Sequence, residues 1–465
     1  MMEENGKKMT LPIAFLIMLI IVAMIMTCIK TGVGIVVPLF LSWLVVYIFC
    51  RILGFDFDKV FGAGMDAFRK AGGAMTIMIS VGFLVGAMIS AGTIPAFIYY
   101  GLQIINPKIF LFCCVIITMI MALATGTSYG SAASAGIALM GVGEAMGMPS
   151  GMIAAAVLTG ALFGDRISPL SDIPVLCSGL VDCDLFKNIR YSLWTSVPPL
   201  IISCIIFLVM GTSFGDSNYN ATTVNVVLDT LSKNFIITPI ALIPVVVVII
   251  LLIMKIPSVP AIFAGAVASA LVAIFYQGHG AAQVFMNMYS GYKLQSGVAI
   301  VDKLLNRGGL TSMTTSIYIL ISAVTLGGML DAIGVIGAFI NPVIQKINSQ
   351  FKVIAATMGT SLFINAIGSA AWLSNILTAK LMMPLYKQED MEPEILARTM
   401  EDGYIFGTII FPWHAMTIYF TGVLGCTWAS YMPYLFFNYL TPIFTLAFAA
   451  TGIGMYRRKK TAVAK

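Results

Sequence analysis

The chain has 465 residues, of which 59% are hydrophobic and only 10% are charged. So few charged side chains cannot solvate the surface of a water-soluble fold, and this composition excludes that class. The formal net charge is +6, but the basic residues gather at the ends of apolar segments, where they orient helices in a membrane. We therefore expect the lipid bilayer, and no nucleic acid, as the partner of this charge pattern.

Apolar runs long enough to cross a bilayer as an α-helix, about 20 residues each, recur along the chain. A transmembrane β-barrel would show alternating polarity instead. The first run follows Lys7 and Lys8 and is interpreted as a retained span, because no convincing cleavage pattern precedes the next run. The sequence predicts an all-α polytopic membrane protein with spans near residues 11–29, 33–50, 74–91, 109–124, 149–164, 191–211, 235–254, 257–277, 314–330, 351–364, 402–424 and 430–453.

Residues 56–70 mix large apolar side chains with charged ones. This pattern is typical of an amphipathic helix at the membrane interface, although an ordinary loop fits it equally well.

Basic residues in short loops predict which ends face the cytoplasm. They cluster near both termini and between residues 51 and 70, whereas the polar stretch 211–234 holds one basic residue, Lys233. We predict a first transmembrane repeat at 1–212, an extracytoplasmic connector at 213–234, a second repeat at 235–456 and a basic tail at 457–465. Both termini are expected in the cytoplasm of a cell with a bacterial-type inner membrane.

Short motifs recur in the same order in the two halves. Asn106-Pro107 matches Asn341-Pro342, and Gly126-Thr127-Ser128 matches Gly359-Thr360-Ser361, at offsets of 235 and 233 (342 − 107 and 359 − 126). If the connector lies outside, the second half enters the membrane from the opposite face. The pattern predicts two inverted-topology repeats with broken helices and re-entrant hairpins, an arrangement typical of secondary transporters.

Broken helices survive in lipid only where the freed backbone groups face protein, water or a ligand, so breaks indicate sites. Thr127 and Ser128 offer hydroxyl oxygens beside loosening glycines, and Thr360 and Ser361 repeat the pattern. Hard cations such as sodium prefer oxygen donors, so these four residues are predicted to line the pathway. The alternative is a helix-packing face made of small residues.

The most informative stretch, residues 163–174, holds two carboxylates and two hydroxyls beside two prolines. An acidic side chain at the bilayer centre costs about 2.5–3.5 kcal/mol on insertion scales, so it is rarely present without a partner or a task. Asp165 and Asp172, with Ser168 and Ser171, are the predicted cation and proton site. Burial favours the neutral form of a carboxyl group, which would let protons and cations compete, and this competition is all that exchange requires. The alternative pairs Asp165 with Arg166 and makes Asp172 a helix cap.

The candidate site residues of the second half include no carboxylate. Asn365 and Ser369 can supply oxygens but no protons, and Trp413 and His414 stand together in an apolar run after a proline. These four complete the predicted pathway lining. His414 could relay protons, although a hydrogen-bonded packing histidine is the commoner outcome.

No nucleotide-binding loop, dinucleotide fingerprint, haem spacing or zinc spacing is found in the sequence. We predict neither an enzyme nor a resident cofactor, with sodium as the transported or coupling ion. An intramembrane aspartyl protease is disfavoured because Asp165 and Asp172 share one break, which prevents them from facing each other from two helices.

The motifs Gly126-Thr127-Ser128-Tyr129-Gly130 and Gly141-Val142-Gly143-Glu144, and above all residues 163–172, resemble the NhaC-type sodium/proton antiporters. The resemblance extends through Asp402-Gly403 and Pro412-Trp413 to residues 434–439. It implies a fold of the ion-transporter superfamily with inverted repeats, and exchange of sodium for protons or, in some relatives, of small carboxylates. It also implies Asp165, Ser168, Ser171 and Asp172 as the cation site.

Three departures from the family pattern bear on specificity. Ile173-Pro174-Val175 stands where relatives carry Thr-Thr-Asn, Ala370 lies where an acidic residue is common, and His414 replaces Asn. The leading prediction is a sodium/proton antiporter working by alternating access. The alternative is a sodium- or proton-coupled exchanger of a small organic acid or amino acid. The predicted partners are sodium ions and protons, with a small carboxylate or amino acid in the alternative, and the prediction allows a homodimer.

Overall fold

The computed structural model describes residues 9–104, 106–217, 221–254, 256–344, 347–368 and 371–452. The described chain is built from α-helices and short connections. In chain order the helices are α1 (Leu11–Lys30), α2 (Val36–Leu53), α3 (Phe57–Lys70), α4 (Gly72–Ser90), α5 (Thr93–Ile104), α6 (Phe110–Thr125), α7 (Ser128–Ser131), α8 (Ile137–Ala145), α9 (Ser150–Ile167), α10 (Asp172–Val181), α11 (Leu185–Ser217), α12 (Ala221–Asn234), α13 (Ile243–Ile253), α14 (Ser258–Phe275), α15 (Ala281–Ser290), α16 (Ala299–Leu305), α17 (Thr314–Ala332), α18 (Val335–Ile344), α19 (Gln350–Gly368), α20 (Ala371–Gln388), α21 (Pro393–Ile410), α22 (Ala415–Leu424), α23 (Trp428–Tyr431) and α24 (Phe436–Thr451).

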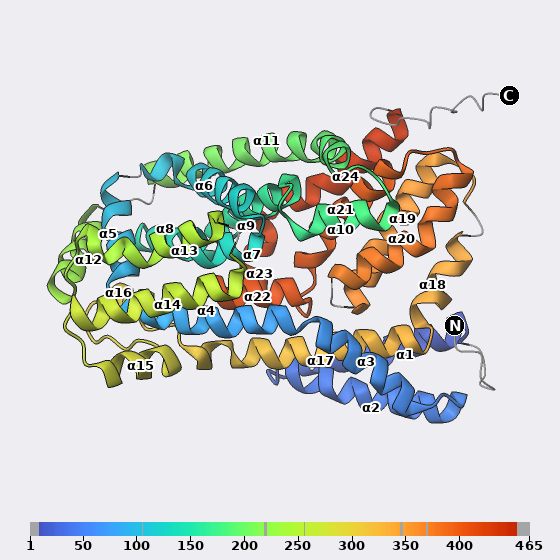
Figure 1. The fold of residues 1–465 in the computed structure, drawn as a ribbon, viewed down its shortest axis with the longest axis horizontal. Coiled ribbons are helices and arrows are strands. Elements are labelled where there is room, and N and C mark those ends of the chain that lie inside the picture. Colours follow the sequence, from blue (N-terminus) through green and yellow to red (C-terminus); the bar gives the residue numbers. More distant parts are fainter. Residues whose placement is uncertain are drawn as a thin grey trace.

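Long helices run side by side along the length of the molecule (Figure 1). Seven described helices are long and apolar enough to cross a membrane, and the number rises to ten if three bent helix pairs each count as one span. The start of α1 and the end of α24 lie at the same end of the molecule, and α12 lies at the opposite end (Figure 1). The prediction of an all-α polytopic membrane protein is confirmed.

One of the predicted spans is wrong. Residues 402–424 are not one span, because α21 ends at Ile410 and α22 begins at Ala415. The helix α20, where no span was expected, is not among the seven helices long and apolar enough to cross a membrane.

Residues 57–70 form the helix α3, which settles the choice between helix and loop. Gly64 of α3 and Gly328 of α17 let the two helices approach closely: a Cβ atom on Gly328 would lie 2.8 Å from the Ala67 side chain and 2.9 Å from the Gly64 Cα. At the end of α3 the Lys70 ammonium lies 4.7 Å from the centroid of the Trp372 ring. This helix is therefore packed along α17.

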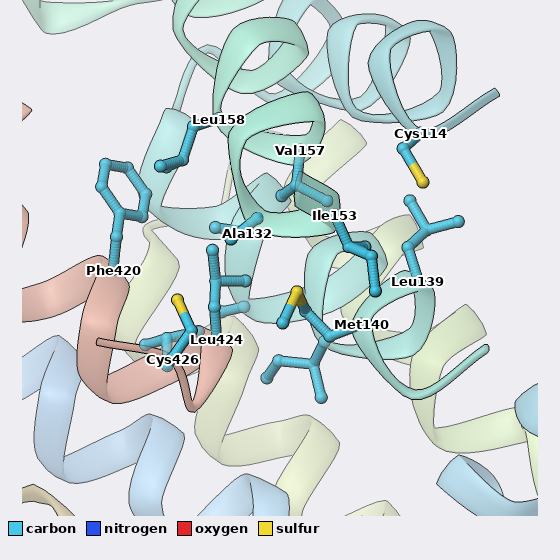
Figure 2. Packing of buried hydrophobic residues seen from close by; sticks show 14 of the residues in the cluster. Cys114, Ala132, Leu139, Met140, Ile153, Val157, Leu158, Phe420, Leu424 and Cys426 are labelled. Atoms are coloured by element: carbon cyan, nitrogen blue, oxygen red, sulfur yellow. The ribbon is translucent and has the colours of Figure 1, made fainter. Parts of the chain in front are cut away.

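The helix α9 lies at the centre of the larger apolar core. Its membrane-length window is 83% buried inside the protein, against 22% for α1, so α9 is enclosed by other helices while α1 faces outward. Figure 2 shows Ile153, Val157 and Leu158 of α9 packed among side chains of α6, α8 and α22. This enclosure places the end of α9, which carries Asp165 and Arg166, inside the protein.

Helix bounds in the two halves repeat at one constant spacing. Pro107–Thr125 (the turn before α6 together with α6), α9 and α10 correspond to α19, α21 and α22, with every first and last residue 243 positions apart (350 − 107, 393 − 150 and 415 − 172 for the first residues). The motif offsets of 233 and 235 found in the sequence therefore do not match the helix register. At a spacing of 243, Gly126 corresponds to position 369, which lies outside the described residues.

Candidate functional site

The four residues 168–171 form a sharp break between α9 and α10. Ser168 ends α9 in extended conformation, and its hydroxyl donates to the Leu123 carbonyl (2.8 Å) and accepts from the Leu170 amide (3.3 Å). Ser171 begins α10 as its N-cap, with its hydroxyl oxygen accepting from the Ile173 amide (3.2 Å). Both serines are buried, so the predicted interruption is present and its backbone is held by its own hydroxyls.

Asp165 lies one turn before this break and is 5% exposed. Its carboxyl lies near Ser171, which begins α10, and near Ser128, whose buried hydroxyl has no hydrogen-bond partner. The Ser128 amide belongs to the first turn of α7, and the N-terminal end of a helical segment carries unsatisfied donors and a partial positive charge. Asp165 is thus a buried carboxylate at the meeting point of two helix beginnings, α7 and α10.

A second break lies against the first one. The helix α6 ends at Gly126, which has a φ of +68°, and Thr127 caps α7 by accepting from the Gly130 amide (3.4 Å). A Cβ atom on Gly126 would lie 2.7 Å from the Leu170 backbone. Only glycine satisfies both the backbone angle and the close contact, so Gly126 holds the two breaks together.

The two predicted carboxylates have different surroundings. Asp172 occupies the first turn of α10 and is exposed, whereas Asp165 is buried. They lie at opposite ends of the break, Asp165 in the last turn of α9 and Asp172 at the start of α10. The structure therefore gives one enclosed acidic group and one at the accessible edge of the break.

In the second half, the predicted interruption at Gly359-Thr360-Ser361 is wrong. Both Thr360 and Ser361 lie within the continuous helix α19, and both are buried. A Cβ atom on Gly403 of α21 would lie 2.4 Å from the Ser361 hydroxyl, so this stretch of α19 contacts α21 directly. Ser369 lies outside the described residues.

The second half is interrupted between α19, which ends at Gly368, and α20, which begins at Ala371, and again at residues 411–414, between α21 and α22. His414 is the N-cap of α22: its Nδ1 accepts from the Met416 amide (3.2 Å), and its Nε2 faces the Asn365 Oδ1 (3.2 Å). Since Nδ1 accepts, Nε2 carries the proton and donates to Asn365, so the ring is neutral. Trp413 donates from Nε1 to the Ala366 carbonyl (2.7 Å). Both side chains hold the break against α19.

The largest group of buried charges was not predicted from the sequence. Arg166 does not pair with Asp165; its Nη2 lies 2.6 Å from Asp402 Oδ1 and its Nε lies 3.4 Å from Glu401 Oε2. All three side chains are at most 1% exposed. The alternative of a local Asp165–Arg166 pair is therefore wrong, and Arg166 instead joins α9 to α21.

The helix α11 completes this cluster with three uncharged polar side chains. Asn188 Nδ2 donates to Glu401 Oε1 (2.7 Å), and the Ser192 hydroxyl donates to Glu401 Oε2 (2.5 Å). The Thr195 hydroxyl donates to Asp402 Oδ1 (2.9 Å). Adjacent acids in an apolar segment were a usable signal, because intramembrane carboxylates indicate a task or a partner. The partner on α11, by contrast, is set by the tertiary fold.

Among the described residues, no group of three or more His, Cys, Asp and Glu side chains comes together as a metal site. The side-chain oxygens near Asp165 are those of the Ser128 and Ser171 hydroxyls, and hydroxyl oxygens suit a hard cation better than a soft transition metal.

Comparison with known proteins settles the family. The model of the Na+/H+ antiporter family matches residues 160–453, a range that includes both the Ser168–Ser171 break and the Arg166 cluster. The chain belongs to the Na+/H+ antiporter family. It is 34% identical to a malate-2H+/Na+-lactate antiporter of Bacillus subtilis, with 91% of each chain covered. It is 32% identical to the Na+/H+ antiporter NhaC of Alkalihalophilus pseudofirmus (92% of each chain), and 29% identical to the arginine/ornithine antiporter ArcD of Halobacterium salinarum (87% of this chain, 84% of the relative). This Na+/H+ antiporter family member thus matches its relatives over nearly their whole length.

Proposed function

We propose that the protein exchanges sodium ions for protons across a bacterial-type inner membrane by alternating access. The observation that carries the proposal is Asp165, a buried carboxylate at a broken helix in a membrane protein of this family. A carboxylate in that position can hold either a sodium ion or a proton, and a site that releases one to take the other couples their movements.

The cation site we propose consists of Asp165, Ser168, Ser171 and Asp172. Asp165 supplies the enclosed charge, and the two serine oxygens lie on either side of the break. Asp172, exposed on the first turn of α10, attracts the cation at the accessible edge. Thr127 and Ser128 extend this site toward α7, and Asn365, Trp413 and His414 form the corresponding wall of the second half.

We further propose that the two halves are inverted repeats, supported by the constant spacing of 243 between their helices. Their boundary lies near the end of α11 and α12, in the segment expected to connect the halves outside the membrane. The start of α1 and the end of α24, which lie at the same end of the molecule (Figure 1), would then face the cytoplasm.

A second candidate is coupled exchange of a small organic acid or amino acid. It is favoured by the 34% identity to the malate-2H+/Na+-lactate antiporter and by the arginine/ornithine antiporter among the relatives. Trp413 at the 411–414 break is partly exposed and offers an indole ring surface, which suits an organic ligand better than a bare cation.

The test uses purified protein in proteoliposomes that contain a pH-sensitive dye and carry an imposed pH gradient. Sodium added alone is expected to collapse the gradient, whereas potassium is not. If the gradient collapses only when malate, lactate, arginine or ornithine is also present, the second candidate replaces the first one. If no cation or solute moves protons, neither function holds.

Two variants place the activity at the break. Asp165→Asn keeps the size of the side chain and removes its charge, so sodium-driven proton movement should be lost. Asp172→Asn is compared with Asp182→Asn, because both aspartates are exposed and stand at opposite ends of α10. Apparent sodium affinity should be weaker in Asp172→Asn but not in Asp182→Asn. Equal sodium affinities in these two variants would show that Asp172 is not part of the site.

A further inference from the structure

A stripe of polar side chains runs along the interface between α11 and α21. On α21 it comprises Glu394, Arg398, Glu401 and Asp402, whose spacing of three and four residues places them on one face. On α11 the facing residues are Lys187, Asn188, Tyr191, Ser192 and Thr195, with the same helical spacing. These nine residues are called the α11–α21 stripe.

The stripe starts at the protein surface and ends in the interior. The Lys187 side chain is 44% exposed, and its ammonium lies 2.9 Å from Glu394 Oε1 and 3.4 Å from Glu392 Oε2. Tyr191 donates to Glu392 from its hydroxyl. At the other end Thr195, Glu401 and Asp402 are 0% exposed. The stripe therefore places polar side chains from the protein surface to the sealed carboxylate.

The two neighbouring acids of the stripe are satisfied to different degrees. Both Glu401 oxygens accept hydrogen bonds: Oε1 from Asn188, and Oε2 from Ser192 and Arg166. Asp402 Oδ1 accepts from Arg166 and Thr195, but Asp402 Oδ2 is buried and has no hydrogen-bond partner. A buried acceptor without a donor is unfavourable, so Asp402 is the acid with room for one more ligand.

The ligand that fits this position is a proton. A hard cation gathers several oxygen ligands around itself, whereas the Asp402 surroundings are filled by hydrogen-bond donors of Arg166 and Thr195. A proton on Oδ2 needs no ligand shell. The titratable and charged groups that face Asp402 or its neighbour Glu401 are Arg166 from α9, Cys177 from α10, Cys183 from the α10–α11 connection, Tyr386 from α20, and Arg398 and Glu401 from α21 itself.

We propose that Asp402 is a proton-binding residue, separate from the sodium site at Asp165 and reached along the α11–α21 stripe. Arg166 is the physical link between the two carboxylates, because it follows Asp165 in the chain and contacts Asp402. Through Arg166, sodium binding at Asp165 would act on Asp402 and so couple sodium binding to proton release. This proposal rests on the proposed sodium/proton exchange.

The experiment measures two activities in the same proteoliposomes. Counterflow of radioactive sodium against unlabelled sodium needs only the sodium site, whereas the full rate of sodium-driven proton movement needs both sites. Asp402→Asn should lower sodium-driven proton movement by about tenfold or more, as expected for removal of a group that transfers protons, while counterflow is retained. Loss of counterflow in folded protein would make Asp402 a sodium ligand or a structural residue, and unchanged proton movement would show that it carries no proton. Either result overturns the proposal.

Because Asp402→Asn changes a buried ion pair, a milder variant accompanies it. Thr195→Val removes the hydroxyl donor of Asp402 Oδ1 without changing charge or shape. Since that donor stabilises the charged carboxylate, the pH of half-maximal exchange should rise in this variant. The matched control is Ser196→Ala, whose buried hydroxyl donates to the Ser192 carbonyl within α11 (2.7 Å). An unshifted midpoint in Thr195→Val, or an equal shift in both variants, overturns the proposal even if Asp402→Asn does not fold.

The wild-type protein tests the proposed function independently of this site. If the wild type shows no sodium-driven proton movement, sodium/proton exchange fails. If the wild type is active and the variants behave like it, exchange stands and the assignment of Asp402 fails.

Discussion

Replacing Arg166 with methionine removes the guanidinium that joins Glu401 and Asp402 but keeps a long apolar side chain. The two carboxylates, both 0% exposed, would then lack the cation that lies 3.4 and 2.6 Å from them. Breaking a buried ion pair costs about 3–5 kcal/mol. Because one guanidinium serves two acids here, we expect a loss of about 4–5 kcal/mol in the free energy of unfolding, at the upper end of that range.

The assay is unfolding of the purified protein in mixed micelles by titration with sodium dodecyl sulfate. The control is Arg69→Met, which breaks the Arg69–Asp66 pair at 2.9 Å, where the side chains are 76% and 64% exposed. Surface pairs contribute about 0–1 kcal/mol, so this variant should unfold almost like the wild type. Adding Asp402→Leu to Arg166→Met should recover part of the loss by removing one stranded acid. Equal losses for Arg166→Met and Arg69→Met would refute the reasoning that burial makes the Arg166 contacts strong.

Three further predictions concern the breaks and the packing around them. Gly126→Ala should destabilise the protein more than Gly147→Ala in the same unfolding assay: both glycines have positive φ, but only the first would contact neighbouring backbone, which adds about 1–3 kcal/mol. Gly160→Ala, whose Cβ would lie 2.1 Å from a carbonyl oxygen of α6, should be strongly destabilising, whereas Gly179→Ala, with nothing within 4 Å, should not. His414→Ala should lose about 1 kcal/mol of capping energy and His414→Asn much less, and because both ring nitrogens are engaged, the pH profile of exchange in His414→Asn should match that of the wild type.

Composition and short motifs were sufficient to predict the membrane class and the first-half break. Apolar runs mark helices because lipid requires every backbone group to be paired within a helix. The run 163–174 indicated a break because prolines, hydroxyls and acids interrupt it together, and the structure places Ser168–Ser171 between α9 and α10. Local chemistry was enough in these cases.

The motif comparison failed where it relied on residue identity instead of helix length. Gly359-Thr360-Ser361 resembles Gly126-Thr127-Ser128, but a glycine opens a helix only where the backbone takes a positive φ, as Gly126 does. Gly359 is an ordinary position in α19. The spacing of 243 is visible in helix bounds, and these cannot be located to the residue from hydropathy alone.

The cluster around Arg166, Glu401 and Asp402 could not be predicted from the sequence, because its members come from α9, α11 and α21. Glu401 is more than 200 residues away in the chain from its partners Arg166 and Asn188. Sequence proximity favoured the wrong pair, Asp165 with Arg166. Successive residues on a helix point about 100° apart, so adjacent charges face different neighbours. Asp165 turns toward the break, and Arg166 turns toward α21.

The break between α9 and α10 and the break between α21 and α22 have corresponding helix bounds but different side chains. This difference bears on how many charges move in one transport cycle. At a spacing of 243, Asp165 corresponds to Thr408 and the Ser171 cap to the His414 cap. The Thr408 hydroxyl donates to the Tyr404 carbonyl (2.9 Å), so the second break offers no carboxylate at that position. Asp165 alone could exchange one sodium ion for one proton and move no net charge. If Asp402 takes a second proton, each sodium ion is exchanged for two protons, and the exchange should respond to membrane potential. We expect potassium and valinomycin to change the rate of wild-type exchange but not the residual rate of Asp402→Asn, and a wild-type rate that is independent of potential would contradict a second proton.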